Sequence, residues 1–110
     1  MKFTQEVKDK WVNALESGVY KKGTGKLRIG DKYCCIGVLV EIMDDIKINE
    51  TGTEFESTIG YNHTKGYQSG GLGLEYSLVE SLIDLNDSVY YLDKTFKNMI
   101  PQIKELEVEL

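Results

Sequence analysis

The stretch YCCIGVLV, residues 33–40, is the longest unbroken apolar run of the chain. It lies between a loop rich in Lys and Gly and an acidic break at Asp44 and Asp45. The apolar residues that recur at helical spacing up to this break are Cys35, Ile36, Leu39, Ile42 and Met43. We predict a buried helix here. A buried strand remains the alternative, because periodicity does not separate the two over so short a run.

A first helix is predicted over residues 4–17. Thr4 is suited to cap its amino terminus, and Gly18 stands where a left-handed residue ends a helix. Its apolar stripe consists of Phe3, Val7, Trp11, Ala14 and Leu15. This spacing of three and four residues predicts one buried face.

A small hairpin is predicted between this helix and the apolar run. Residues 19–26 are typical of a loop. Leu27 and Ile29 alternate with polar neighbours, which predicts a short strand. Residues 30–31 favour a turn, and Tyr33 begins the return strand.

Residues 46–73 are polar and rich in glycine. Nearly thirty residues without regular structure are unusual in a compact domain, so we expect at least one hairpin or a functional flap here. A helix is predicted next over residues 75–85, ending at the polar residues 86–88. Its inward side chains are expected to be Leu78, Val79, Leu82 and Ile83.

The last predicted helix covers residues 94–108, with Asp93 as its cap. Its expected buried face is Phe96, Met99, Ile100, Ile103 and Leu106. Pro101 removes a backbone donor and crowds the carbonyl group four residues earlier. We therefore expect a kink or a break near Lys97.

Length and composition are those of one globular domain covering residues 1–110. Hydrophobic residues make up 41% of the chain and charged residues 28%, which excludes the disordered class. No apolar run approaches the roughly 18 residues that span a bilayer. The expected fold is α+β, a single small domain with three to four helices and a small antiparallel sheet or hairpin. The expected location is the cytoplasm in which the protein is made, without membrane association.

The net charge of -5 argues against general nucleic-acid binding, which needs a basic surface. The charge is unevenly distributed. Residues 20–32 hold five basic residues against Asp31 alone, a local charge of +4, so the rest of the chain carries -9. Such a basic patch can attract a compact anion. A solvated loop without function is the alternative explanation.

The basic segment also carries glycines, which let backbone amides approach an anion. The spacing of Gly18 and Gly23 matches a phosphate-binding P-loop, but Thr24 stands where that motif has Lys and a helix precedes it. This is therefore not a nucleotide-hydrolase loop. The candidate ligand-binding residues are Tyr20, Lys21, Lys22, Lys26, Arg28, Tyr33, Asn86 and Asp87.

The two cysteines are adjacent in sequence and form a poor disulfide framework, so we expect reduced, buried thiols. A cysteine hydrolase is an alternative, with Cys34 or Cys35 activated by His63 and assisted by Asn86 or Asp87. With one histidine and no Cys-x-x-Cys motif, no metal site is expected. We assign no catalytic residue and no cofactor.

Residues 11–27, WVNALESGVYKKGTGKL, and residues 33–39, YCCIGVL, carry a resemblance. The chain resembles a family of small phage and prophage proteins that share a W-x-x-A-L-x-S-G-x-Y start and a Y-C-C-L-G-V-L core motif. The end of that family, Leu-Asn-Asp followed by a Phe-led amphipathic helix, is matched by residues 85–88 and 96–103. Residues 44–74 match nothing in it.

The biochemical function of that family is uncharacterised, so the resemblance implies context and no mechanism. Small accessory phage proteins are often counter-defence factors. The resemblance therefore favours a homo-oligomeric, non-enzymatic anti-defence protein that sequesters a small nucleotide-derived immune signal without cleaving it. The alternative is an acidic inhibitor that binds a host defence protein, and a small cysteine hydrolase is third.

Overall fold

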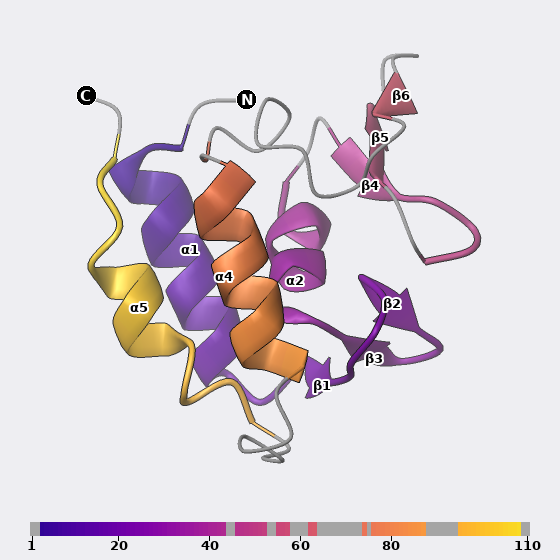
Figure 1. The fold of residues 1–110 in the computed structure, drawn as a ribbon, viewed down its shortest axis with the longest axis horizontal. Helices are drawn as coiled ribbons and strands as arrows, with labels where there is room; N and C mark the ends of the chain where they lie inside the picture. The colour runs from indigo at the N-terminus through magenta and orange to yellow at the C-terminus, as the bar shows by residue number, and fades with distance from the viewer. Residues whose placement is uncertain are drawn as a thin grey trace.

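The computed structural model describes residues 3–43, 46–52, 55–57, 62–63, 74, 76–87 and 95–108. The helices in this part of the chain are α1 (Gln5–Glu16), α2 (Cys35–Glu41), α4 (Tyr76–Asp87) and α5 (Ile100–Lys104). One sheet contains β1 (Lys21–Lys22), β2 (Arg28–Ile29) and β3 (Lys32–Tyr33), and a second contains β4 (Ile46–Ile48), β5 (Phe55–Ser57) and β6 (Asn62–His63). The predicted α+β class is confirmed (Figure 1).

Helix α2 occupies the centre of the fold and confirms the helical interpretation of the apolar run. All residues from Cys35 to Val40 are buried. The helix packs against α1, α4 and β4, so it has no solvent-facing side over this span (Figure 1). This explains why its sequence is continuously apolar and not amphipathic.

Helix α1 forms as predicted. The Oγ1 of Thr4 accepts a hydrogen bond of 3.3 Å from the amide of Val7, and Gly18 follows the helix with a φ of 77°. The buried face includes Trp11 and Leu15. The indole Nε1 of Trp11 donates to the carbonyl oxygen of Cys35 at 2.9 Å, which joins α1 to α2.

The predicted hairpin is also present. Strands β2 and β3 pair antiparallel, and Gly30 turns between them with a φ of 60°. The segment predicted as a loop contains one more strand, β1, which pairs in parallel with β3. A strand of two residues has no hydrophobic pattern of its own, so only its pairing with β3 reveals it.

The second sheet confirms that the polar middle of the chain contains a hairpin. Strands β4, β5 and β6 are antiparallel, and Ile46 and Ile48 bury their side chains. The amide of Arg28 donates to the carbonyl oxygen of Gly52 at 3.1 Å, which links the two sheets.

Helix α4 runs to Asp87, two residues beyond its predicted end, so Asn86 lies in its last turn. Val79 and Leu82 are buried as predicted, whereas the side chain of Leu78 is 38% exposed. The inward prediction for Leu78 is wrong. The face of α4 that meets α2 passes through Val79, Leu82 and Asn86, and Leu78 lies beside this face.

The last predicted helix is broken, as Pro101 indicated, and its predicted length is wrong. Helix α5 covers only Ile100–Lys104, with the proline in its first turn. There the missing amide costs no intrahelical hydrogen bond, so the proline starts the helix and does not kink it. Phe96, Met99 and Ile103 are buried as predicted. The expected cap at Asp93 lies outside the described residues.

None of the described helices is long and apolar enough to cross a membrane.

Gly37 permits the close approach of α2 to the β-hairpin. A Cβ atom built at this position would overlap the carbonyl oxygen of Leu27 and lie 2.8 Å from its carbonyl carbon. Backbone atoms cannot rotate away as a flexible side chain can. The helix and the hairpin would therefore have to separate.

We predict that Gly37→Ala lowers the free energy of unfolding by about 3 kcal/mol or more, because it overpacks a backbone contact. The measurement is urea denaturation followed by the fluorescence of the single tryptophan, Trp11. Gly30→Ala is the matched control, since its φ is positive but its Cβ meets nothing within 4 Å. It should cost about 1 to 2 kcal/mol. Equal losses in the two variants would contradict the prediction.

Candidate functional site

The small sheet divides the predicted basic residues between its two faces. Paired residues on neighbouring strands point to the same side of a sheet. The register places Lys21, Lys32 and Ile29 in one row and Lys22, Tyr33 and Arg28 in the other. The first row is exposed and the second is half-buried. The basic segment is therefore not one continuous patch.

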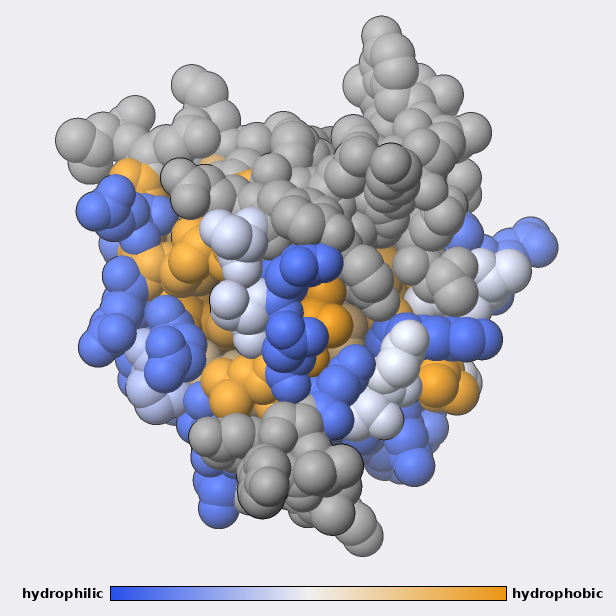
Figure 2. Space-filling view, in the orientation of Figure 1, coloured by the Kyte–Doolittle hydropathy of each residue, from blue (hydrophilic) through white to orange (hydrophobic). Residues whose placement is uncertain are grey.

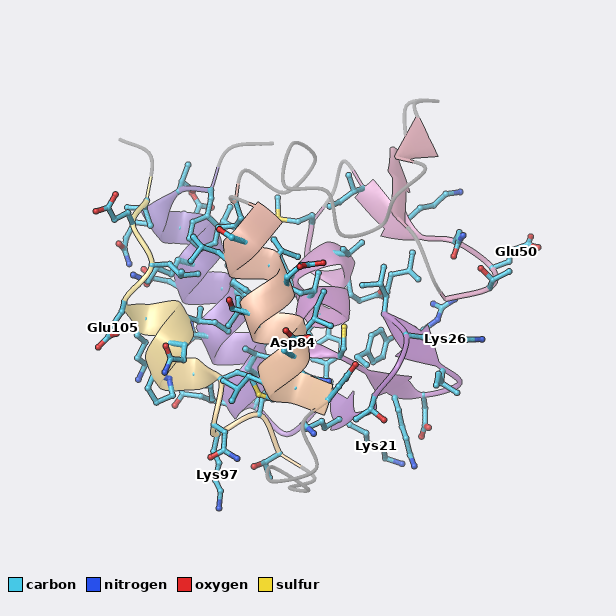
Figure 3. The ribbon with its side chains drawn as sticks, in the orientation of Figure 1. Lys21, Lys26, Glu50, Asp84, Lys97 and Glu105 are labelled. Atoms are coloured by element: carbon cyan, nitrogen blue, oxygen red, sulfur yellow. The ribbon has the colours of Figure 1, made fainter. Side chains whose placement is uncertain are left out.

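Lys26 belongs to the loop between β1 and β2, and it is separated from Lys21 in space. Figure 3 shows Lys26 extending sideways from the sheet, whereas Lys21 extends toward the end of the molecule where Lys97 lies. A single compact anion would therefore not be held by the whole predicted set. The structure instead brings Tyr20 and Lys21 together with residues near the start of α5.

Tyr20 is held by its neighbours. Its ring meets that of Tyr33 edge to face, with centroids 5.2 Å apart and an interplanar angle of 88°. Burial, with a smaller contribution from the charge of Glu41, raises the pKa of the Tyr20 phenol. Tyr20 therefore remains a neutral hydroxyl group and an aromatic surface at neutral pH.

Lys21 forms an exposed ion pair with Asp31, with 2.9 Å between Nζ and Oδ2. The hydrogen bond between them raises the pKa of Lys21 and lowers that of Asp31. Exposed ion pairs of this kind contribute little to stability and exchange partners readily. Lys21 can therefore turn to an anionic ligand at small cost.

A pocket of about 530 Å³ opens between the end of α1, strand β1 and the start of α5. Its lining residues are Leu15, Glu16, Gly18, Tyr20, Lys21, Thr95, Phe96, Lys97 and Ile100. Two of these, Tyr20 and Lys21, belong to the predicted ligand-binding set. The residues at positions 95–100 were missed, because their helical spacing indicated core packing only.

The pocket combines an apolar base with charged groups. Leu15 and Phe96 are buried and form part of the wall, while Lys21 and Lys97 contribute ammonium groups. Among the lining residues that the structure describes, the carboxylate is that of Glu16, whose Oε1 lies 3.9 Å from the Nζ of Lys104. The lining therefore suits a ligand that has a flat apolar part and an anionic part.

Asn86 fixes the basic loop to the core. Its side chain is completely buried, and its Oδ1 accepts a hydrogen bond of 3.1 Å from the amide of Cys35. Its Nδ2 donates to the carbonyl oxygen of Gly23 at 2.9 Å and to the Oδ1 of Asp87 at 2.9 Å. These internal bonds make Asn86 a positioning residue. Its direct contact with a ligand stays a prediction.

The glycine amides of the loop are also used internally. The amide of Gly25 donates to the Oδ2 of Asp87 at 3.3 Å, and that of Gly23 donates to the carbonyl oxygen of Tyr33 at 2.7 Å. An anion at this loop would compete with the carboxylate of Asp87. The glycine amides are therefore not available to bind phosphate as the sequence suggested. An anion would have to be bound by side chains.

The cysteines are reduced and buried, as predicted. The Sγ of Cys34 caps α2 by accepting a hydrogen bond of 3.3 Å from the amide of Gly37. The Sγ of Cys35 donates to the carbonyl oxygen of Leu82 at 3.7 Å. Each thiol has a structural role at the base of α2.

Burial raises the pKa of the Cys34 thiol to about 11 and that of Cys35 well above its usual value. A cysteine nucleophile needs a lowered pKa instead. His63 belongs to β6, in the other sheet, and its side chain lies outside the described part. Asn86 does lie next to Cys35, but it accepts a hydrogen bond from the Cys35 backbone amide and does not assist the thiol.

No group of three or more metal-ligating side chains occurs among the residues that the structure describes.

The chain belongs to the family described as Domain of unknown function (DUF8296), whose model matches residues 1–107. No curated protein and no solved structure matches it. The family assignment gives no activity, so the geometry of the pocket is the basis for a functional proposal.

Asn86→Ala is expected to lower the free energy of unfolding by about 2 to 4 kcal/mol, since it leaves the Gly23 carbonyl and the Cys35 amide without their partner. Urea denaturation followed by Trp11 fluorescence measures this. The matched control is Asp87→Asn, which changes the exposed neighbour and keeps an acceptor for the Gly25 amide. Its cost should stay below about 1 kcal/mol. A similar loss in both variants would refute the positioning role.

Stability should fall at alkaline pH because the folded state favours the neutral Cys34 thiol. The contribution is complete below the usual thiol pKa near 9 and is lost as the pH rises toward about 11. Cys34→Ser removes this titration and keeps a group that can accept from the Gly37 amide. Between pH 7 and pH 10 to 11, it should lose about 1 to 2 kcal/mol less stability than the unmodified chain. Parallel pH profiles would count against the burial of this thiol.

Proposed function

We propose that this DUF8296 protein binds a small phosphorylated, nucleotide-type ligand without cleaving it, in the pocket lined by Tyr20 and Lys21. The observation that carries the proposal is that one pocket of about 530 Å³ joins aromatic and apolar walls to two lysines. This volume falls in the range of about 300 to 1,000 Å³ that is typical of small-molecule sites.

The lining suggests how such a ligand would sit. A base or another flat ring would pack against the half-buried ring of Tyr20, above an apolar floor formed by the buried Leu15 and Phe96. A phosphate group would lie near Lys21, which would exchange Asp31 for it. The anion therefore contacts side chains at the end of α1 and the start of α5, and not the glycine amides.

Binding without cleavage fits the state of the nucleophiles in the described residues. Cys34 and Cys35 are buried, and their raised pKa values suppress the thiolate. Both thiols are also engaged in hydrogen bonds that hold α2 in place. The described residues that line the pocket include no cysteine or histidine.

The resemblance to small phage proteins supplies the biological part of the proposal. In that context the ligand is a nucleotide-derived immune signal, and the protein removes it from the host cytoplasm by sequestration. A homo-oligomer would suit this role, since several sites in one particle raise the capacity for the signal. This part rests on the resemblance alone.

Isothermal titration calorimetry with cyclic oligonucleotides and cyclic ADP-ribose-type molecules tests the proposal. One member of this panel should release heat, and mass spectrometry should recover it intact. Lys21→Ala should weaken its binding about tenfold or more, because a charged contact to phosphate is lost. Lys26→Ala removes the same charge outside the pocket and should change the affinity less than about twofold.

Tyr20→Phe separates the ring from the hydroxyl group and should retain binding if stacking dominates. Absence of heat with every compound would end the proposal. Equal losses for Lys21→Ala and Lys26→Ala would move the site from the pocket to the loop.

A further inference from the structure

A second concave surface lies at the seam between α4 and α5. Its lining residues are Leu78, Ser81, Leu82, Leu85, Gln102 and Leu106, and its volume is about 280 Å³. Figure 2 shows hydrophobic surface gathered along this seam. We call these six residues the α4–α5 groove. It shares no residue with the pocket of the proposed function.

The apolar side chains of the groove follow the pattern of a docking face. Leu78, Leu82 and Leu85 lie four and three residues apart along α4; Leu82 is buried and forms the floor of the groove, Leu85 is half-buried, and Leu78 is exposed. Leu78 is 38% exposed, although the core is closed by the neighbouring face of the helix. Leu78 is therefore not needed for the packing of α4 on α2.

The other wall of the groove is held in place. The carbonyl oxygen of Leu106 accepts a hydrogen bond of 2.8 Å from the Nζ of Lys8, whose side chain is buried against the end of the chain. Helix α5 packs on α1, and α4 packs on α2. The groove lies between these two helix pairs, so the packing within this chain already forms it in the absence of a partner.

The rim of the groove is acidic. On α4, the exposed Asp84 lies one turn from Ser81 and next to Leu85, whereas Glu80 and Asp87 lie on the side of the helix away from the groove. The described residues from Ile100 to Val108 add two carboxylates and one lysine, Lys104, whose Nζ lies 3.9 Å from Glu16. Figure 3 shows Asp84 on α4 and Glu105 just after α5 on either side of the seam. Negative charge therefore flanks the leucines on both sides.

We propose that the α4–α5 groove binds an amphipathic helix of a partner protein, with apolar side chains on one face and Lys or Arg on both flanks. An apolar groove between helices accepts anchors at positions i, i+3 or i+4, and i+7 of a bound helix. The acidic rim selects basic flanks and speeds association. This surface does not depend on the small-ligand proposal.

A second copy of this chain fits the groove less well. Among the described helices, α1, α2 and α5 turn their apolar side chains into the core, and α4 carries three carboxylates and no basic residue. None of them combines a free apolar stripe with basic flanks on both sides. The charge complementarity therefore favours a basic helix from another protein.

Fluorescence anisotropy with a labelled synthetic peptide of about 18 residues tests this inference. The peptide carries Leu at the anchor positions and Lys on both flanks. It should bind the full chain at least about tenfold more tightly than a peptide with Glu on the flanks or a scrambled peptide of the same composition. Equal binding of the scrambled peptide would overturn the proposal.

Two pairs of variants distinguish binding of the peptide in the groove from general electrostatic attraction between a basic peptide and an acidic protein. Leu78→Ser should weaken the Lys peptide about tenfold, while Val19→Ser, at an exposed apolar residue outside the groove, should leave it unchanged. Asp84→Lys should weaken it more than Glu50→Lys, which makes the same charge change far from the seam (Figure 3). No difference within either pair would overturn the proposal.

The competing occupant is tested by sedimentation. A dimer that Leu78→Ser converts to a monomer would show that a second copy covers the groove, and would also overturn the proposal. Trp11 fluorescence verifies that each variant is folded. Nucleotide titrations should be unaffected by Leu78→Ser, and peptide binding by Lys21→Ala, so each proposal can fail without the other.

Discussion

A helix that is buried on every side needs partners for its terminal polar groups inside the protein, and α2 meets this requirement at its first turn. The amide of Cys35 is satisfied by Asn86, the carbonyl group of Cys35 by Trp11, and the amide of Gly37 by the thiol of Cys34. An unsatisfied buried amide or carbonyl group costs about 1 to 3 kcal/mol. The partners come from α1, α4 and α2 itself, so these three helices are mutually dependent.

This network explains much of the W-x-x-A-L-x-S-G-x-Y and Y-C-C-x-G-V-L motifs of this sequence. Trp11 bonds to α2, Gly18 ends α1 with a positive φ, and Tyr20 packs on Tyr33. The paired cysteines cap α2 and fill the core. Such residues maintain a fold and need not perform chemistry. These motifs therefore belong to the scaffold, while the proposed ligand contacts lie partly outside them, near the start of α5.

Helix α5 connects the two surfaces that we assign to binding. Ile100, at its start, lines the pocket that contains Tyr20 and Lys21, and Gln102 lines the α4–α5 groove. Pro101 lies between them and fixes where the helix begins. A short helix thus forms one wall of each surface. Its placement on α1 decides the shape of both.

The sequence alone determined the α+β class, the limits of α1, the hairpin of β2 and β3 and the buried centre at α2, because these follow from local periodicity, capping and turn residues. It did not determine β1 or the exposure of Leu78, since each depends on a partner distant in sequence. Pro101 indicated the break in the final helix but not how short α5 is. For the site, local composition drew attention to Tyr20 and Lys21 but not to Phe96 and Lys97. Only the tertiary structure shows that these four residues line one pocket and that Lys26 lies outside it. It also shows that the amides of Gly23 and Gly25 already donate hydrogen bonds within the protein. The physical reason is that a charge pattern is local, whereas a pocket and its satisfied hydrogen bonds are set by how distant segments pack.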